Sequence, residues 1–595
     1  MSIKSRKVAL ASAIFSMAVL ASCGGGGGGG TTSTSTPTPP STPPGPTTVA
    51  KVLAQTWTGY YAGNNNQVRV CDLKSDGTIN CGNDLNPSAD TTFSYQYEFS
   101  NGNVLLTDSS NNKAYYFDAT AGTLNKLTNG KDVAGNAVSA QLTLAVAPKD
   151  QNPNFIIYTI GGSDVVITKS GNYVQKTSTG GDISEFYMGD NSNFVVVTDN
   201  TNFKTYRIDA SGNVTEIKDN GSSILFTTLL AKYGDNILVQ ASNNAVYLLK
   251  DDGTLVKIDG TFSGAVSDAQ MVKAGNDFYI AVRNGTNLYY YKNSTRSSNS
   301  PVTLSAGSII EYALDGNGNL YYYDNSSPNL VRAITTGLIA SSNGQAVPSF
   351  GGLIGTSAGV IAKGKDSNGN DASYLLSISG NNITSTISVN PDLFNAVDTC
   401  VTAKSPTNLG EVNGETTSQI MCVDSNTANF SWITYNNGSY NGKQLAPITG
   451  FGSYTDVEFY GNKAVVYGST NKTEICSVGS TASICTPGMT VQGVVKKYNN
   501  ILAMFASYTL SIGDLLAGTS NTIFTDLSNS TLSPGNISAD VSMVAVVKAI
   551  PGSPCATNTI YYPVGNQIIL YNNGTKTTFT SNNLCIYGNL LKLYK

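Results

Sequence analysis

The chain has 595 residues, of which 60 are glycine, 33 are tyrosine and only 12% are charged. Such a composition, also rich in Asn, Ser and Thr, argues against a helical or disordered protein and predicts many short strands joined by tight turns. The net charge of −4 argues against a nucleic-acid partner, and the absence of histidine excludes Ser-His-Asp and Cys-His centres.

The first 22 residues have the layout of an export signal. An apolar stretch over residues 8–20, too short to span a bilayer comfortably, follows the basic residues Lys4, Arg6 and Lys7. Leu20-Ala21-Ser22-Cys23 resembles the lipobox of bacterial lipoproteins. The resemblance implies cleavage before Cys23 and lipidation of its thiol, and Gly24 implies the outer membrane, since aspartate there would favour inner-membrane retention. An ordinary signal peptide with an incidental cysteine is the alternative.

Residues 23–50 read as a lipid anchor followed by a tether. The glycine run from Gly24 to Gly30 passes into a segment of Thr, Ser and Pro that ends near Thr48. This composition cannot bury a core, so we expect a chain that is flexible in its glycine part and semi-rigid where proline extends it. At about 3.1 Å per residue, the Thr- and Pro-rich part alone could reach roughly 50 Å.

From Lys51 onward a pattern of about 40 residues recurs, in which four short strands alternate with turns rich in Asn, Asp and Gly. Clear copies cover residues 183–218, 224–258 and 270–304. A repeat of this length with four strands predicts the blades of a β-propeller. Within residues 313–334, Asp315, Gly318, Asn319 and the tyrosines after them resemble the NHL-type propeller repeat. This resemblance supports the architecture and implies no particular activity.

The repeats add up to about twelve four-stranded blades, which we expect to form two six-bladed propellers, because a single ring would have an improbably wide channel. The first would cover residues 51–340 and the second 341–595, with a seam near residues 337–348 where the pattern lapses. The strands predicted in residues 51–85 are not preceded by the opening strands of a blade, and the strands predicted in residues 584–594 have no partner hairpin. We therefore expect the two ends to pair and close the structure.

Setting Cys23 aside leaves eight of the nine cysteines, an even number that predicts disulfides in an exported chain. Two pairs flank hairpin turns, and the other two follow by proximity. The predicted pairs are Cys71–Cys81, Cys476–Cys485, Cys400–Cys422 and Cys555–Cys585. Because the chain has neither histidine nor a Cys-x-x-Cys motif, we assign no cysteine to a metal.

Two further motifs have both a structural and a functional interpretation. Tyrosine runs at residues 115–116, 289–291, 321–323 and 561–562 could form a surface for stacking on sugars, but strand alternation favours packing between blades. In two loops, Asp and Asn residues at alternating positions could hold calcium through their side-chain oxygens. These loops do not match an EF-hand, and the preference of turns for Asp and Asn explains the residues equally well. These residues are Asp315, Asn317 and Asn319, and Asp366, Asn368, Asn370 and Asp371. We expect no cofactor, with calcium as the alternative.

The sequence identifies no catalytic residue. We expect a lipoprotein on the periplasmic or cell-surface side of a bacterial outer membrane, held by the Cys23 lipid, whose body binds a protein or a polysaccharide. One alternative is a carbohydrate-active enzyme, a hydrolase or lyase that uses Asp/Glu chemistry, and another is a structural component of an envelope or extracellular assembly. Converging Asp, Glu and Arg would favour the enzyme, whereas a broad apolar, Tyr-rich face would favour the binding protein or the assembly.

Overall fold

The computed structural model describes most of residues 45–387, with short gaps, and between 399 and 594 the strands given below with a few adjoining residues. Residues 1–44, with Cys23 and most of the tether, lie outside the described residues, as do most residues of the expected seam. Thr47–Lys595 forms a compact unit of its own. The division of this unit into two propellers stays a prediction.

The described strands form twelve sheets, in which all strand pairs are antiparallel except β8 with β13. The first sheet contains strands from both ends of the unit. Its strand order is β3-β2-β1-β54-β51. Its strands are β1 (Thr48–Trp57), β2 (Gln67–Lys74), β3 (Ile79–Cys81), β51 (Val564–Gly565) and β54 (Cys585–Tyr594).

Seven sheets follow in chain order up to residue 387, most of them with the up-and-down order of a blade. Their strands are β4 (Phe93–Glu98), β5 (Val104–Asp108), β6 (Lys113–Asp118) and β7 (Thr123–Lys126); β8 (Gly130–Lys131), β9 (Ala137–Val138), β10 (Asp150–Asn152), β11 (Phe155–Ile160), β12 (Ser163–Thr168) and β13 (Tyr173–Val174); β14 (Glu185–Tyr187), β15 (Phe194–Asp199), β16 (Lys204–Asp209), β17 (Val214–Asp219) and β18 (Ser222–Ser223); β19 (Phe226–Tyr233), β20 (Asn236–Ala241), β21 (Val246–Leu249) and β22 (Leu255–Lys257); β23 (Asp268–Ala274), β24 (Asp277–Asn284), β25 (Asn287–Lys292), β26 (Thr295–Arg296) and β27 (Val302–Thr303); β28 (Tyr312–Leu314), β29 (Leu320–Asp324), β30 (Leu330–Ile334) and β31 (Gln345–Ala346); and β32 (Gly352–Thr356), β33 (Gly359–Lys365), β34 (Asp371–Ser379) and β35 (Asn382–Ile387).

Four more sheets lie between residues 399 and 580. Their strands are β36 (Thr399–Val401), β37 (Ser418–Asp424), β38 (Asn429–Asn436) and β39 (Ser439–Leu445); β40 (Tyr454–Tyr460), β41 (Lys463–Gly468), β42 (Lys472–Val478), β43 (Ser483–Cys485) and β44 (Val491–Gln492); β45 (Val495–Tyr498), β46 (Ile501–Ala506), β47 (Thr509–Asp514) and β48 (Thr519–Phe524); and β49 (Ile537–Asp540), β50 (Met543–Lys548), β52 (Gln567–Asn572) and β53 (Thr575–Thr580). This succession of small antiparallel sheets confirms the predicted all-β propeller fold.

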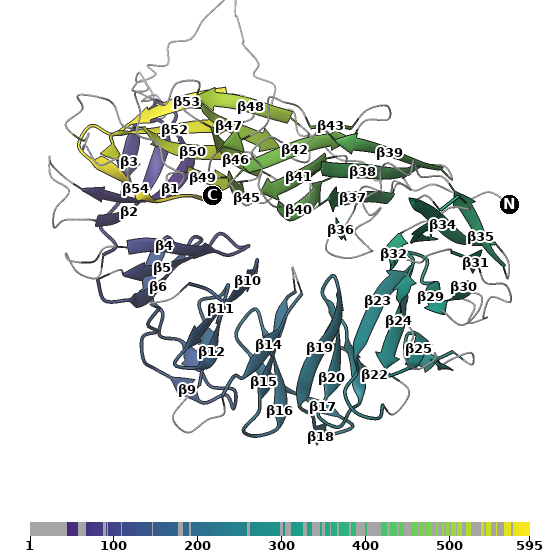
Figure 1. The fold of residues 1–595 in the computed structure, drawn as a ribbon. Helices are drawn as coiled ribbons and strands as arrows, with labels where there is room; N and C mark the ends of the chain where they lie inside the picture. The colour runs from purple at the N-terminus through teal and green to yellow at the C-terminus, as the bar shows by residue number, and fades with distance from the viewer. Residues whose placement is uncertain are drawn as a thin grey trace, which may run out of the picture. The chain divides into compact units, whose positions relative to one another are not determined.

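Neighbouring sheets pack face to face, as Figure 1 shows for the sheets that contain β14–β17 and β19–β22. All six residues of β15 are buried because both faces of its sheet are covered. Val195 and Val197 contact the preceding sheet, whereas Val196 contacts Val239 and Tyr247 of the following sheet. This double burial explains why the central strands are continuously apolar rather than alternating.

An Asp-x-x-Gly-Asn turn joins strands at Asp132–Asn136, Asp209–Asn213 and Asp315–Asn319. In each turn the aspartate Oδ1 accepts a hydrogen bond from the backbone N–H of the last asparagine, at 2.8–2.9 Å. The asparagine side-chain amide donates to Oδ2 at the same range of distances. The glycines have φ of 82–88°, a left-handed conformation that other residues adopt at a cost. Asp, Gly and Asn are therefore each required by the geometry of the turn.

The two ends of the compact unit pair, as the incomplete strand sets at either end predicted. Strand β1 lies antiparallel to β54 on one side and to β2 on the other. A disulfide joins Cys71 to Cys81 across β2 and β3, which confirms that predicted pair. Lys592 of β54 has a side chain that is only 4% exposed and forms an ion pair with Glu98 at the end of β4. The closing strand is therefore tied to the next sheet by a largely buried charge pair.

Replacement of Glu98 by glutamine should destabilise the protein more than replacement of Lys592 by methionine. Glu98→Gln leaves the buried ammonium group without its anionic partner, and breaking a buried pair in this way costs about 3–5 kcal/mol, while Lys592→Met removes the buried charge itself. Glu98 is 30% exposed and can be hydrated on its own. Denaturant unfolding of the two variants and of the double variant, which should recover part of the loss, measures this order. A larger loss for Lys592→Met would contradict it.

Candidate functional site

Of the three other predicted disulfides, the structure shows one and gives the backbone register of the other two pairs. A second disulfide joins Cys555 and Cys585, whose Cα atoms lie 5.4 Å apart. In the backbone register, Cys400 lies directly opposite Cys422, and Cys476 lies directly opposite Cys485. Bonds within these two pairs stay predictions, as does the lipid on Cys23.

The described tyrosine runs pack between sheets. Seven of these side chains are at most 6% exposed, namely Tyr115, Tyr116, Tyr290, Tyr291, Tyr321, Tyr322 and Tyr323. Burial raises the pKa of Tyr116 to about 12. Tyr289 is half-buried and its ring meets that of Phe262 edge-on, with centroids 5.2 Å apart. These rings therefore contribute mainly to the core, and residues 561–562 lie outside the described residues.

The first candidate calcium loop is held together by its own hydrogen bonds. Asp315 is buried, and its carboxylate accepts bonds from the backbone N–H groups of Asn317 and Asn319 and from the Asn319 side chain. Burial raises the pKa of this carboxyl to about 6, against the effect of those hydrogen bonds. Asp366 and Asn370 of the second loop lie outside the described residues. Where side chains are described, no group of three Cys, Asp or Glu residues is placed to hold a metal.

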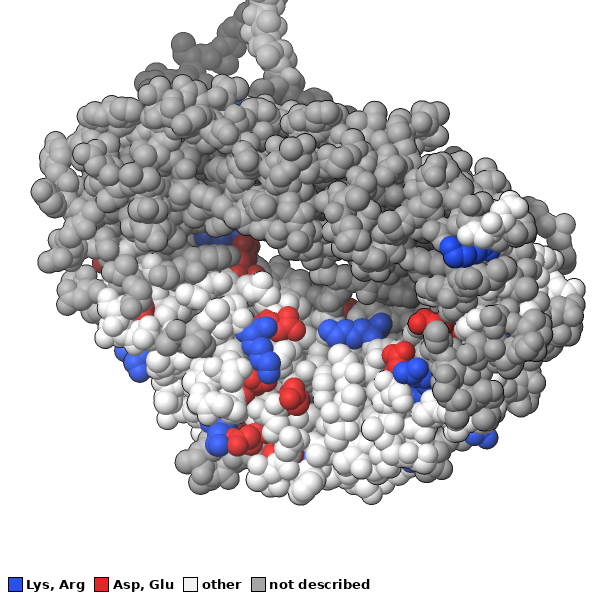
Figure 2. Space-filling view, in the orientation of Figure 1, with Lys and Arg blue, Asp and Glu red and all other residues white. Residues whose placement is uncertain are grey.

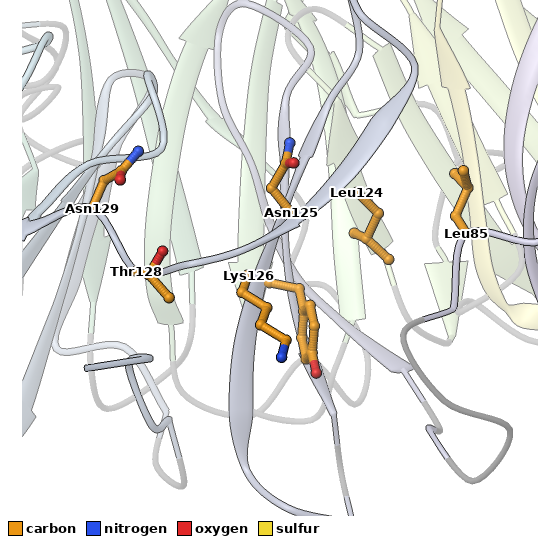
Figure 3. Close-up of a pocket in the computed structure, with 7 residues that line it drawn as sticks. Leu85, Leu124, Asn125, Lys126, Thr128 and Asn129 are labelled. Atoms are coloured by element: carbon orange, nitrogen blue, oxygen red, sulfur yellow. The ribbon is translucent and has the colours of Figure 1, made fainter. Parts of the chain in front are cut away.

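A cavity of about 530 Å³ lies beside β7, the outer strand of its sheet (Figure 3). Figure 3 shows Leu124, Asn125 and Lys126 following one another along this strand, with Leu85 on a neighbouring segment. The lining residues combine apolar, amide, hydroxyl and ammonium groups: Leu85, Tyr115, Leu124, Asn125, Lys126, Thr128 and Asn129. No sequence motif predicted this site, because its residues come from one sheet and from two segments outside the strands.

Main-chain pairing positions the two walls of the cavity. Lys126 lies directly opposite Tyr115 across β6 and β7, and the Tyr115 ring is fixed edge-on against Phe93, with centroids 5.0 Å apart. On the other wall, Leu85 is held by a 2.7 Å hydrogen bond from its backbone N–H to the carbonyl of Val68. Leu85 and Leu124 both pack against the apolar cluster between the first two sheets. The cavity therefore has a rigid apolar base and a polar rim.

Lys126 is an exposed lysine whose charge bears on what the cavity could bind. On the face seen in Figure 2, several of the described Lys and Arg side chains lie beside Asp or Glu side chains. Lysines of other sheets have carboxylate partners, as in the 2.9 Å pair of Lys149 with Asp164 and the 3.0 Å pair of Lys292 with Asp277. Among the described residues, Lys126 has no such carboxylate partner. An exposed cation at the rim of a cavity favours an anionic group in whatever binds there.

No protein-family model matches the chain, and no curated protein matches it. Among solved structures, AztD from Citrobacter koseri in its apo form is 9% identical, with a TM-score of 0.31 over 56% of this chain and 92% of that chain. BamB from Moraxella catarrhalis is 13% identical, with a TM-score of 0.28 over 57% and 95%. Virginiamycin B lyase from Staphylococcus aureus is 11% identical, with a TM-score of 0.19 over 52% and 95%. At TM-scores this low, the fold assignment depends on the strand topology.

No helix among the described residues is both long and apolar enough to cross a membrane.

Removal of the Asp209 carboxylate should destabilise the protein at neutral pH and much less in acid. Burial acts to raise the pKa of Asp209, but bonds from Asn213 and Ser211 outweigh it and hold the pKa below 3.8. A lowered pKa stabilises the folded state above about pH 4, and this contribution is lost as the pH falls through the folded-state pKa. Asp209→Ala should therefore cost about 1 kcal/mol at pH 7 and less at pH 3. Thermal unfolding at both pH values tests this, with the exposed Asp150→Ala as the control; an equal loss at pH 3 would contradict it.

Proposed function

We propose that the protein is a lipid-anchored bacterial envelope protein whose body binds an acidic polysaccharide at the cavity beside β7. The observation that carries this proposal is the pairing of an apolar base with the uncompensated ammonium group of Lys126 at the rim. A volume of about 530 Å³ is in the range of sites that enclose small ligands, and a polymer needs only one or two of its units inside.

The lining chemistry matches the two kinds of surface that a sugar presents. Leu85, Leu124 and the edge of Tyr115 offer contacts to the C–H faces of a sugar ring. Asn125, Asn129 and Thr128 provide donors and acceptors for hydroxyl groups, since amide and hydroxyl side chains supply both. Lys126 adds a charged donor for a carboxylate or sulfate substituent. These features favour a polysaccharide over the protein partner that we also considered from the sequence.

The proposed anchor fits this role because its tether is long enough to hold the folded body away from the membrane. The order of basic, apolar and Leu-Ala-Ser-Cys residues before Gly24 supports lipidation of Cys23 and an outer-membrane location. A tether that extends by about 3.1 Å per proline-rich residue would let the body reach polymers well beyond the lipid headgroups. Binding at a distance from the membrane needs such a spacer, whereas an enzyme for small diffusible substrates does not.

Replacement of Cys23 by serine should release the protein from membranes. A single acyl chain binds only marginally and several chains anchor stably, so loss of the thioether lipid together with the processing that depends on it removes the anchor. Fractionation after a high-salt wash measures the effect, and Ser22→Ala, which keeps a small residue before the cysteine, is the control. A serine variant that stays in the membrane pellet would show that something else anchors the protein.

Lys126→Met should weaken binding to acidic polysaccharides by about tenfold or more, because one charge-assisted hydrogen bond is worth about 1.5–3 kcal/mol. Mobility of the full chain in gels that contain alginate, polygalacturonate or hyaluronan measures binding, with dextran as the neutral reference. Lys131→Met removes an equally exposed lysine from the next sheet and should leave mobility unchanged. If none of the three acidic polymers retards the wild-type protein, the proposed ligand class is wrong.

A further inference from the structure

Phe203, in the turn between β15 and β16, combines high exposure with an unfavourable backbone conformation. The residue is 68% exposed, and among the described residues Val49 is the only other exposed large hydrophobic one. Its φ is 56°, in the left-handed region that L-residues disfavour and bulky ones rarely adopt. The folded protein thus tolerates backbone strain at Phe203 without burying its ring in return.

A second turn of the same construction shows which residue suits this position. In the turn between β5 and β6, as in the turn of Phe203, an asparagine side chain donates to the carboxylate of the aspartate three residues before it, at 2.7–2.8 Å. The following residue is left-handed in both turns, and in the first it is Asn112, with a φ of 55°. Asparagine adopts this conformation much more readily than phenylalanine. The geometry of the turn therefore does not explain the aromatic ring. The two hydrogen-bonded pairs are Asn111–Asp108 and Asn202–Asp199.

Hydrogen bonds between turns align the three sheets of β4–β7, β8–β13 and β14–β18. The Asn101 side chain, after β4, donates to the carbonyl of Lys169 in the next sheet at 2.8 Å. The Asn172 side chain of that sheet donates to the carbonyl of Ser211 in the third sheet at 2.7 Å. These contacts join the β4–β5, β12–β13 and β16–β17 connections, so the same ends of the three sheets lie together.

The other ends of these strands hold both the cavity and Phe203. Strand β7 ends there with Lys126, and the β5–β6 and β15–β16 turns lie at the corresponding ends of their sheets. In the middle sheet the β11–β12 turn consists of Gly161 and Gly162, which have no side chains. Packed sheets lie about 10 Å apart, so two sheet spacings, about 20 Å, separate the turn of Phe203 from the sheet of the cavity. A polymer can cover that distance, but a single sugar unit cannot.

An isolated aromatic ring suits a polysaccharide better than a protein partner. Protein interfaces bury a cluster of apolar side chains at their centre. The residues that precede Phe203 in its turn are instead polar and exposed, namely Asn200, Thr201 and Asn202. One aromatic ring can cover the C–H face of one sugar unit, and polar neighbours can bind its hydroxyl groups.

We infer that Phe203 is a second contact for the polysaccharide held at the cavity beside β7, and that its ring stacks on a sugar unit farther along the same polymer. This inference rests on the proposed function, because the polymer that reaches Phe203 is the one bound at Lys126. Two contacts on one chain act together, so chains long enough to reach both bind more tightly than short ones.

The first test needs no ligand. Phe203→Asn gives this turn the residue that its counterpart has at Asn112, so the strain is relieved and no buried contact is lost. The melting temperature should therefore equal or exceed the wild-type value. A lower melting temperature would show that the ring supports the fold, and the proposal would be wrong.

The second test measures the mobility of the full chain in gels that contain alginate, polygalacturonate or hyaluronan. Phe203→Asn should weaken binding by about threefold to tenfold, since a stacked aromatic contact is lost. Val49→Asn is the matched control. It removes the other exposed hydrophobic residue, which lies at the opposite end of the strands, where β1 begins, and it should leave mobility unchanged.

The two proposals fail in different ways. Weaker binding by Lys126→Met but not by Phe203→Asn would leave the cavity in place and overturn the contact at Phe203. Weaker binding by Phe203→Asn alone would contradict a polymer shared with the cavity. If no acidic polymer retards the wild-type protein, both proposals are wrong. Sedimentation velocity provides the last check, because an oligomer that Phe203→Asn converts to a monomer would assign the ring to a contact between copies and overturn the proposal.

Discussion

Among the described side chains, burial of both faces of the sheets from the first to that of β28–β31 is the constraint on which the rest of this structure depends. A sheet such as that of β14–β18 has apolar residues on each side, and only a neighbouring sheet can cover each of them. The same arrangement continues from the sheet of β49–β53, through the first sheet, to that of β32–β35. A sheet without a neighbour would expose an apolar face, and the sheet that β1 and β54 form together is covered by the sheet of β49–β53 on one face and by that of β4–β7 on the other.

Close approach between sheets requires glycine at a few positions that face a tyrosine ring. The ring of Tyr279 lies against Gly318 of the next sheet, where a Cβ atom would come within 2.3 Å of the ring. Tyr116 lies against Gly171 in the same way, at 2.8 Å. Each turn glycine therefore meets two demands, a left-handed backbone and space for a neighbour's ring. A change at either position would disturb the turn and the packing together.

The repeat pattern was enough to predict the strands, the turns, the pairing of the chain ends and the Cys71–Cys81 disulfide, because each depends on residues close in sequence or on simple strand matching. Copies of the Asp-x-x-Gly-Asn turn at Asp132 and Asp209 make the same hydrogen bonds as the copy at Asp315, which alone stood out as NHL-like. The cavity beside β7 escaped prediction. Leu124, Asn125 and Lys126 follow one another on one strand, but Leu85 comes from a segment outside the strands, and only the packing of the folded chain brings it to the same cavity.

The position of β1 has a mechanical consequence. The strand begins at Thr48, immediately after the proposed tether, and lies inside its sheet, with antiparallel partners over Thr48–Thr56 on the β2 side and Lys51–Trp57 on the β54 side. A pull on the tether along the strand loads these two ladders in shear, so many hydrogen bonds must break at once rather than in succession. The Cys71–Cys81 bond holds the neighbouring hairpin shut under the same load. If the body is anchored and binds a polymer as proposed, this arrangement of β1 would resist drag that would peel an edge strand away.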